Sequence, residues 1–375
     1  MKKIAIDLTW LRIRKVGGTE SSIMNLLRGI SLAGYAGIEF YIITARDNHA
    51  EIYDRLKTGD YQFIEADVMS AVQWKRVLWQ NTKLCKLLKD NNIEDCLEPI
   101  YSMPFTNLRG IKFYTIIHDL QALHYPHYFK RARVHWMKIN WRNTARRAHK
   151  IIAISDYVKE DIEKNYPKSQ GKIVRIYDAI EIKENNISDD ILLERFGVEK
   201  GNYYYTVSSL LPHKNLGTLI KMLAELKEKK NPQLKPLVIS GVGGSKGDEL
   251  LQLANKFNVA ECIKFTGFVR DEDRNMLYRN CSAFLFPSTF EGFGMPPIEA
   301  LILGARVITT KCASIPEITD NICEYVDNPF DAAEWAQKVQ QTVDSCQRDY
   351  SDKINELIER YSITKVAQEY MELFK

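Results

Sequence analysis

Short apolar runs alternate with longer amphipathic stretches along most of the chain. In the first half, the runs at 4–6, 40–43, 113–117 and 151–154 predict strands. The pattern then restarts, with further runs at 203–207, 237–239, 263–265, 284–286 and 307–309. Runs of this length, separated by helical stretches, are typical of parallel sheets with crossover helices. The pattern therefore predicts an α/β protein with two such sheets.

The division between the two sets of strands is expected near a charged segment, 178–190, with Asn185-Asn186 at its middle. A chain of 375 residues is longer than one hydrophobic core usually supports. The end of the chain, 354–373, has helical periodicity. We therefore expect a first domain at 1–182, a second at 183–355 and a C-terminal helical segment at 356–375.

Composition narrows the class of protein. Hydrophobic residues make up 45% of the chain, yet no apolar run approaches the eighteen residues of a membrane-spanning helix. The first seven residues predict a strand and not a signal peptide, because their apolar run stops at Asp7. The seven cysteines are scattered without C-x-x-C spacing, which favours reduced thiols over disulfides or a zinc site. We expect a cytoplasmic protein.

Charge is distributed unevenly. Residues 1–180 hold 29 Lys and Arg against 19 Asp and Glu, a net charge of +10, whereas the rest of the chain has −6. Two basic stretches contain tryptophans, a combination that suits an anionic membrane surface at the inner face of the plasma membrane. The alternatives are a solvated basic face over core tryptophans, or nucleic acid, for which no motif is present. The expected membrane or acceptor surface comprises Trp74, Trp79, Lys130, Arg131, Arg133, Trp136, Trp141, Arg146 and Arg147.

Two carboxylates flank a glycine-bearing loop that follows the run at 283–286. Glu291 is in the loop, and Glu299 is expected in the first turn of a helix that begins near two prolines. We expect neither glutamate to lie in the core. Gly292 and Gly294 lack a Cβ, so backbone N–H groups at the helix start can approach a phosphate or sugar hydroxyl. The plain structural alternative is a Glu that complements the helix dipole beside a solvated Glu291.

Three shorter motifs follow other predicted strands. Gly17-Gly18 precedes a helix at 23–30, His118-Asp119 follows the strand at 113–117, and 212–215 reads Pro-His-Lys-Asn. The carboxyl ends of parallel strands are where α/β sheets place ligands. Each motif could equally be an ordinary structural feature, namely a tight turn, a core histidine and an exposed loop lysine.

The Glu291 to Glu299 spacing around Gly-Phe-Gly-x-Pro resembles the E-x7-E motif of the family-4 retaining glycosyltransferases. The three shorter motifs occur in that family's order, so the resemblance covers nearly the whole chain. It implies the GT-B fold, in which two Rossmann-like domains face a central cleft and a C-terminal helix crosses back to the N-terminal domain. It also implies a nucleotide diphosphate sugar as donor and domain closure that excludes water.

The resemblance assigns roles to individual residues. Lys214 would neutralise the diphosphate, Glu291 and His118 would contact the donor sugar, and Glu299 would bind the ribose diol. Relatives commonly have Arg five positions before the Lys; here Ser209 stands there, which places more of the charge on Lys214. The expected catalytic residues are His118, Lys214 and Glu291. The expected donor-binding residues are Gly17, Gly18, Ser209, His213, Lys214, Val269, Glu291, Gly292, Phe293, Gly294, Met295 and Glu299.

Two further segments have the look of ligand motifs, but their context favours a helix start and a turn. Asp271-Glu272-Asp273 has D-x-D spacing, yet Asp271 is interpreted as a helix cap and the family does not need a metal or other cofactor. The glycine-rich 241–247 lacks Walker A spacing and predicts a flexible turn.

These features together predict a metal-independent retaining hexosyl- or deoxyhexosyltransferase. We favour GDP-mannose or a rhamnose nucleotide as the donor. The acceptor is expected to be a lipid-linked glycan in cell-surface polysaccharide biosynthesis. A GT-B-like nucleotide-sugar epimerase, which takes no acceptor, is the alternative enzyme, and a non-catalytic sugar-nucleotide binding protein is a third. The residues leave the donor base, the sugar, the linkage and the oligomeric state open.

Overall fold

The structure is a computed structural model that describes the chain except for residues 16, 36, 107–109, 184–186, 243–244 and 347. The expected linker centre, Asn185-Asn186, and Gly243-Gly244 of the glycine-rich turn lie outside the described residues. The chain divides into two units: unit 1 is Met1–Glu181 with Arg360–Lys375, and unit 2 is Ile182–Glu359. The sequence placed these divisions at 182/183 and 355/356.

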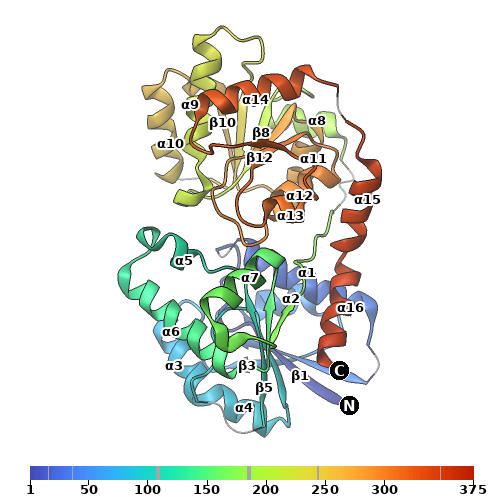
Figure 1. Ribbon diagram of the computed structural model, residues 1–375. Coiled ribbons are helices and arrows are strands. Elements are labelled where there is room, and N and C mark those ends of the chain that lie inside the picture. Colours follow the sequence, from blue (N-terminus) through green and yellow to red (C-terminus); the bar gives the residue numbers. More distant parts are fainter. Residues whose placement is uncertain (16, 36, 107–109, 184–186, 243–244, 347) are drawn as a thin grey trace. The chain divides into compact units, whose positions relative to one another are not determined.

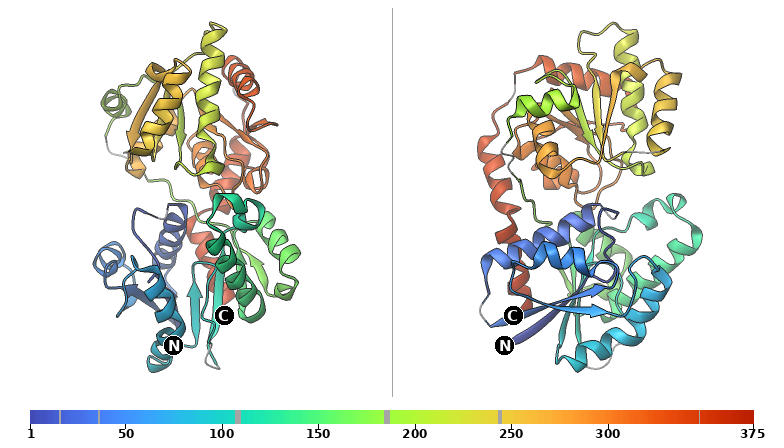
Figure 2. Two further views of the ribbon diagram at one scale, coloured as in Figure 1. Left: turned by 90° about the vertical axis from the view of Figure 1, so that its left-hand side faces the viewer. Right: turned by 180° about the vertical axis from the view of Figure 1, so that it is seen from behind.

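Unit 1 contains a seven-stranded parallel sheet in the order β3-β2-β1-β4-β5-β6-β7. Helices lie on both faces of this sheet (Figures 1 and 2). The strands are β1 (Lys2–Asp7), β2 (Ile38–Ala45), β3 (Tyr61–Ala66), β4 (Asp95–Glu98), β5 (Lys112–Ile117), β6 (Lys150–Ala153) and β7 (Ile173–Arg175). The helices are α1 (Gly18–Ala33), α2 (His49–Leu56), α3 (Gln73–Trp79), the π-helical η1 (Gln80–Leu84), α4 (Cys85–Asp90), α5 (Gln121–His124), α6 (Arg131–Arg147), α7 (Asp156–Asn165) and α16 (Ile363–Phe374).

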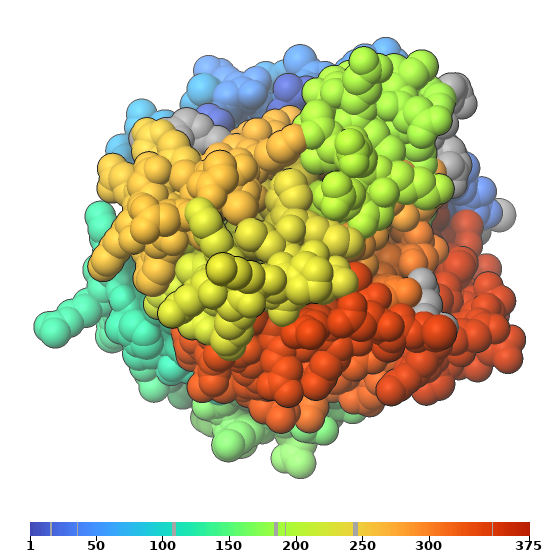
Figure 3. All heavy atoms as spheres, turned by 90° about the horizontal axis from the view of Figure 1, so that it is seen from above, coloured from blue at the N-terminus to red at the C-terminus, as the bar shows by residue number. Residues whose placement is uncertain are grey.

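Unit 2 contains a six-stranded parallel sheet in the order β10-β9-β8-β11-β12-β13. The strands are β8 (Tyr204–Val207), β9 (Leu237–Ser240), β10 (Ile263–Gly267), β11 (Ala283–Phe286), β12 (Val307–Thr310) and β13 (Glu324–Val326). The helices are α8 (Asp189–Phe196), α9 (Leu216–Glu228), α10 (Ser245–Lys256), α11 (Asp271–Asn280), α12 (Met295–Ile302), α13 (Ile315–Ile318), α14 (Ala332–Asp344) and α15 (Ser351–Arg360). Within unit 2, α9 packs against α10 and α14 (Figure 3).

All nine predicted strands are present, and the two parallel sheets confirm the α/β class. The strands β9 and β11, and β5 after Lys112, are buried on both faces because helices cover both sides of a parallel sheet. Sequence reasoning missed β3, β4, β7 and β13. These four are short or interrupted by charged residues, so they lack the continuous apolar run that marks the others.

The predicted C-terminal helix is two helices, α15 and α16, separated at Tyr361-Ser362. The Ser362 hydroxyl accepts a hydrogen bond from the Lys365 N–H at 3.3 Å and so caps α16. This second helix packs on α1 of unit 1, as expected. The contact is close: a Cβ on Gly29 would overlap the Ile363 carbonyl oxygen, which explains why glycine occupies that position.

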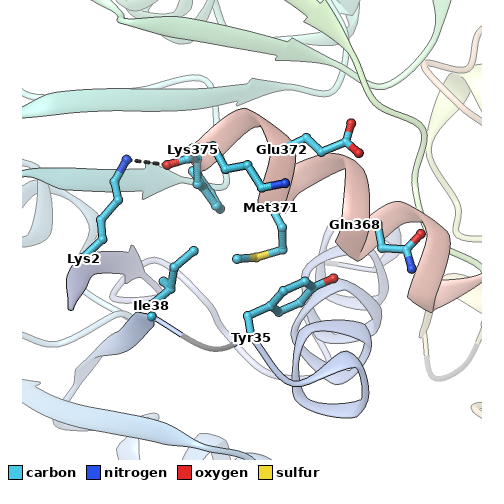
Figure 4. A pocket seen from close by; sticks show the side chains of 9 residues that line it. Lys2, Tyr35, Ile38, Gln368, Met371, Glu372 and Lys375 are labelled. Atoms are coloured by element: carbon cyan, nitrogen blue, oxygen red, sulfur yellow. Dashed lines mark hydrogen bonds between the residues drawn. The ribbon is translucent and has the colours of Figure 1, made fainter.

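Unit 1 also has a cavity of about 360 Å³ beside α16. Figure 4 shows Tyr35, Ile38 and Met371 around it, with a hydrogen bond from the Lys2 ammonium to the Phe374 carbonyl oxygen nearby. Lys2 and Ile38 are the first residues of β1 and β2. The cavity is therefore at the amino ends of these strands, at the opposite edge of the sheet from the predicted site residues of unit 1.

Candidate functional site

Lys214 and Glu291 form an ion pair in unit 2, with Nζ and Oε1 2.6 Å apart. Lys214 ends a short 3₁₀ turn between β8 and α9, and Glu291 lies in the loop between β11 and α12. Because β8 and β11 are parallel neighbours, both loops leave the same edge of the sheet. The side chains are 19% and 12% exposed, so the pair is largely shielded yet still reaches solvent. The structure thus brings together two of the predicted site residues.

His213 connects these two loops through its backbone. Its carbonyl oxygen accepts hydrogen bonds from the Thr289 N–H at 2.8 Å and the Ser288 hydroxyl at 3.2 Å. Burial, and secondarily the positive charge of Lys214, lower the pKa of His213 to about 4. The imidazole is therefore neutral at pH 7. It could contribute a hydrogen bond to a ligand but no positive charge.

The glycine loop is shaped by packing. Gly294 has φ of +99°, and a Cβ there would lie 2.6 Å from the Ile315 side chain of α13. Ser314 fixes the loop further, because its hydroxyl donates to the carbonyl oxygens of Glu291 at 3.0 Å and Phe293 at 2.8 Å. The stretch from Gly292 to Met295 is buried. The loop therefore presents Glu291 from a rigid support that the sequence pattern did not identify.

Glu299 differs from the expectation in two ways. It is the fifth residue of α12, past the first turn, and it is buried, at 8% exposure. Its Oε1 lies 3.1 Å from the Arg274 guanidinium, and its Oε2 accepts a hydrogen bond from the Tyr278 hydroxyl at 3.0 Å. The expectation that Glu299 lies outside the core was wrong. Sequence reasoning also missed Arg274 and Tyr278 as its partners, since only their four-residue spacing on one helix face hinted at a shared contact.

The other donor-side residues of unit 2 lie on neighbouring strand-end loops. Ser209 is exposed and follows β8, and Val269 is half-buried after β10. Between these strands, Gly241 after β9 donates its N–H to the Gly267 carbonyl oxygen at 2.8 Å. A Cβ on Gly241 would lie 2.5 Å from the Ser208 carbonyl oxygen. The loops after β8 and β9 are therefore close together, and the loop after β9 contacts the end of β10 along the same edge of the sheet.

Three of the predicted catalytic and donor-binding residues, Gly17, Gly18 and His118, belong to unit 1. Gly17 caps α1 with φ of +63°, and Gly18 begins that helix. His118 follows β5, and its Nε2 lies 2.9 Å from the Pro99 carbonyl oxygen. Burial raises the pKa of the Asp178 carboxyl, an effect opposed by the nearby His118 and by a 2.5 Å hydrogen bond from the Ser22 hydroxyl of α1. A buried acid thus connects the surroundings of His118 to α1.

The predicted membrane-facing residues divide between surface and core. Trp74 is 66% exposed, and Lys130, Arg131, Arg133, Arg146 and Arg147 are exposed. Trp79 and Trp136 are half-buried. Trp141 is fully buried, so its placement on the surface was wrong. It lies on α6 in register with Val134 and Met137, which form the apolar face of this helix.

The acidic triplet at 271–273 begins α11. The cap position belongs to Arg270, which corrects the interpretation of Asp271 as the cap. Asp271 pairs with Lys183 at 2.7 Å and Arg274 at 3.2 Å. Across the described residues, no three His, Cys, Asp or Glu side chains are grouped so that they could hold a metal ion. None of the helices in the described part of the chain is long and apolar enough to cross a bilayer.

Comparisons with known proteins agree with this architecture. The model for Glycosyltransferase Family 4 matches residues 16–184, and the model for Glycosyl transferases group 1 matches 191–360. The first match covers the strands of the first sheet except β1, the second covers every strand of the second sheet, and together they span most of the chain. The chain belongs to the family-4-like glycosyltransferases of the GT-B fold.

Among curated relatives, the chain is 26% identical over 223 residues to O-antigen chain mannosyltransferase B of Escherichia coli, covering 59% of this chain and 58% of that protein. It is 27% identical over 255 residues to O-antigen chain mannosyltransferase RfbU of Salmonella typhimurium, covering 67% and 66%. The match thus spans less than two thirds of either relative's length. The fold is similar to that of Anabaena Alr3699/HepE, solved with UDP and glucose, with TM-score 0.72, 16% identity and coverage of 100% and 99%.

Proposed function

We propose that this chain is a retaining glycosyltransferase that transfers a hexosyl group from a nucleotide diphosphate sugar to a glycan in cell-surface polysaccharide biosynthesis. The observation that carries the proposal is the Lys214–Glu291 pair at the carboxyl edge of the second sheet. The breaking bond joins the sugar to the diphosphate. The cation can stabilise the negative charge that develops on the diphosphate, and the carboxylate can accept hydrogen bonds from the sugar hydroxyls. The relatives' names support a mannosyl group, and we favour GDP-mannose over a rhamnose donor.

In the proposed reaction, the acceptor oxygen forms a bond to the anomeric carbon on the face from which the diphosphate leaves. The bond from that carbon to the β-phosphate oxygen breaks, and the acceptor's proton passes to the phosphate. Lys214 stabilises the charge on the departing diphosphate, while Glu291 holds sugar hydroxyls. His213 contributes a neutral hydrogen bond because its pKa is about 4. His118 stays assigned to the sugar by resemblance.

The nucleotide is expected to extend from this pair toward Glu299. The carboxylate of Glu299 is held in place by Arg274 and Tyr278, and a carboxylate has more acceptor sites than these two contacts use. A ribose diol can therefore donate to it. Ser209 and Val269 border the same edge of the sheet. We further propose that no metal is required, since Lys214 and backbone N–H groups supply the positive potential.

A donor panel tests the proposal. The full-length protein is incubated with GDP-mannose, UDP-glucose and a dTDP-rhamnose donor, each with and without a lipid-linked glycan acceptor, before and after EDTA treatment. Mass spectrometry should detect a product one hexose heavier with release of nucleoside diphosphate, NMR should show that the anomeric configuration is retained, and EDTA should change neither. An isomeric nucleotide sugar formed without acceptor would indicate the epimerase instead. Loss of activity on chelation, restored by Mg²⁺ or Mn²⁺, would overturn metal independence.

A further inference from the structure

Helix α3 of unit 1 has its polar side buried and its apolar side in solvent. Arg76 is 7% exposed and Gln80, which follows the helix directly, is 2% exposed, whereas Trp74 and Leu78 are 66% and 56% exposed. Residues four apart share a face of a helix, and residues two apart lie on nearly opposite sides. The two polar residues therefore form one face and the two large apolar residues the other, the reverse of an ordinary surface helix.

The buried face of α3 meets carboxyl groups of the sheet. Gln80 donates a hydrogen bond to Glu98 at the end of β4, with 3.0 Å between Nε2 and Oε2. Burial raises the pKa of both Glu98 and Asp7, the last residue of β1, and the Arg76 guanidinium opposes both shifts. The Gln80–Glu98 hydrogen bond joins this helical segment to the sheet, and Arg76 is buried on the same side. The large apolar side chains Trp74 and Leu78 are left in solvent.

The chain segments that contain α3 and α6 are rich in positive charge. Residues 69–89 contain five Lys and Arg and no Asp or Glu, and residues 130–150 contain eight and none. The two stretches are connected through Phe105: its N–H donates to Asn81 Oδ1 at 2.7 Å, its ring lies 5.8 Å from that of Trp136, and its carbonyl oxygen accepts from Arg147. Helices α3, α4 and α6 are labelled in the same part of unit 1 in Figure 1.

We propose that this basic apolar surface, formed by Trp74, Leu78 and the cations of α3, η1 and α6, docks on an anionic lipid bilayer. Indole rings favour the headgroup level of a bilayer, and lysine and arginine side chains beside them are attracted to anionic headgroups. Neither apolar insertion nor electrostatic attraction alone anchors a protein stably to a bilayer, and stable binding usually requires both. The complete absence of acids from both stretches favours lipid over a protein partner of mixed charge. Docking on a bilayer would place a lipid-linked acceptor within reach of the proposed transferase. Only this connection to the acceptor rests on the proposed function.

Vesicle co-sedimentation of the full chain tests this inference without donor or acceptor, so its failure would leave the transferase proposal standing. The protein is mixed with vesicles of equal parts phosphatidylglycerol and phosphatidylcholine, or of phosphatidylcholine alone. Binding should require phosphatidylglycerol and weaken when ionic strength rises from about 0.1 M to about 1 M, because the Debye length falls from ~10 to ~3 Å. Equal binding to both vesicle types, or none to either, would overturn the proposal.

Two variants with matched controls locate the surface. The pair Trp74→Ser and Leu78→Ser should reduce the partition coefficient on the order of tenfold or more, since two apolar side chains are lost. Phe330→Ser in unit 2, where Phe330 is 61% exposed, should bind like the parent. Lys75→Gln with Lys83→Gln should weaken binding, and the exposed pair Lys229→Gln with Lys230→Gln should not. Circular dichroism confirms folding of each variant. Unchanged binding by the first variant, or a change only in oligomeric mass, would reject the lipid assignment.

Discussion

Glu299 and Arg274 are joined at 3.1 Å between a carboxylate oxygen and a guanidinium nitrogen, and both side chains are largely buried. Arg274 and Tyr278 are one turn apart on α11, so this helix holds the Glu299 carboxylate of α12 from one side. The arrangement fixes the carboxylate before any ligand arrives. It also means that Glu299 supports the packing of two helices in addition to its proposed contact with a ribose.

Replacing Glu299 should therefore lower stability as well as donor affinity. Glu299→Ala leaves the Arg274 guanidinium in a mostly buried position without its main partner, and we expect a loss of about 2 kcal/mol in the free energy of unfolding, reduced from the fully buried case by partial exposure of Arg274. Urea denaturation checks this, with the exposed Glu249→Ala as control. In the folded fraction, KM for the donor should rise more than kcat falls. A fully stable Glu299→Ala protein would contradict the packing role.

Glu291 should behave differently in its kinetics. Ser314 and Gly294 fix its loop through the backbone, so Glu291→Ala should keep the loop's shape. The substitution leaves the Lys214 ammonium, 19% exposed, without its carboxylate partner, so the free energy of unfolding should fall here as well. If Glu291 contacts the sugar where charge and geometry change during the reaction, kcat should fall more than KM rises. Steady-state kinetics with a saturating donor series, on the Glu291→Ala and Glu299→Ala proteins together, measures the contrast. Reversal of the two patterns would exchange the proposed roles of the carboxylates.

Much of the fold could be predicted because most strands are continuous apolar runs. The run 203–207 or 283–286 carries that signal by itself, since parallel strands are buried on both faces. In β4, by contrast, Asp95 and Glu98 are buried with polar partners, Tyr114 and Gln80, that are distant in sequence. Pattern reasoning has no access to such partners, so it reads the segment as polar and misses the strand.

The site shows the same limit. The proximity of Lys214 and Glu291 follows from two neighbouring parallel strands whose ends carry the motifs. The family resemblance implied it, because it assigned both residues to the donor. The burial of Glu299 depends on Arg274 of α11. The sequence analysis considered the start of this helix only as a possible metal-binding D-x-D motif or a helix cap, and did not connect it with Glu299. Trp141 was assigned to the surface by composition, although its spacing from Val134 and Met137 already marks an apolar helix face.

Gly294 should not tolerate a side chain. Gly294→Ala adds a Cβ 2.6 Å from Ile315 in a residue with φ of +99°, and both the overpacking and the backbone strain should act, for a loss of about 3 kcal/mol. Gly304→Ala separates the two effects, because φ there is +80° with open space around the Cβ, and about 1 kcal/mol is expected. Thermal and urea denaturation give both values. Equal losses at the two positions would show that the Ile315 contact costs nothing.

His213 should make stability depend on pH in acid. Its pKa is about 4 in the folded protein and near the ordinary 6.5 in the unfolded chain, so between these values the unfolded state binds more protons. The free energy of unfolding should therefore fall as pH is lowered from 6.5 toward 4, and this contribution should be constant above 6.5. His213→Gln removes the titrating group, so its stability should decline less steeply over that window. Parallel slopes for the two proteins in urea denaturation would show that His213 is not the group responsible.

Lys214 supports the proposed chemistry most directly. Lys214→Ala removes the cation assigned to the departing diphosphate, and turnover should fall by ~100-fold or more, the scale of losing one charge-stabilising group. Nucleoside diphosphate binding, measured by calorimetry, should weaken as well. Lys311→Ala is the matched control, because Lys311 also follows a strand of the same sheet and pairs with an acid, Asp327 at 3.0 Å, yet is 60% exposed. The control should keep parent turnover and affinity. A folded Lys214→Ala protein with near-parent activity would remove the diphosphate assignment, and it would leave Glu291 without its proposed counterpart at this edge of the sheet.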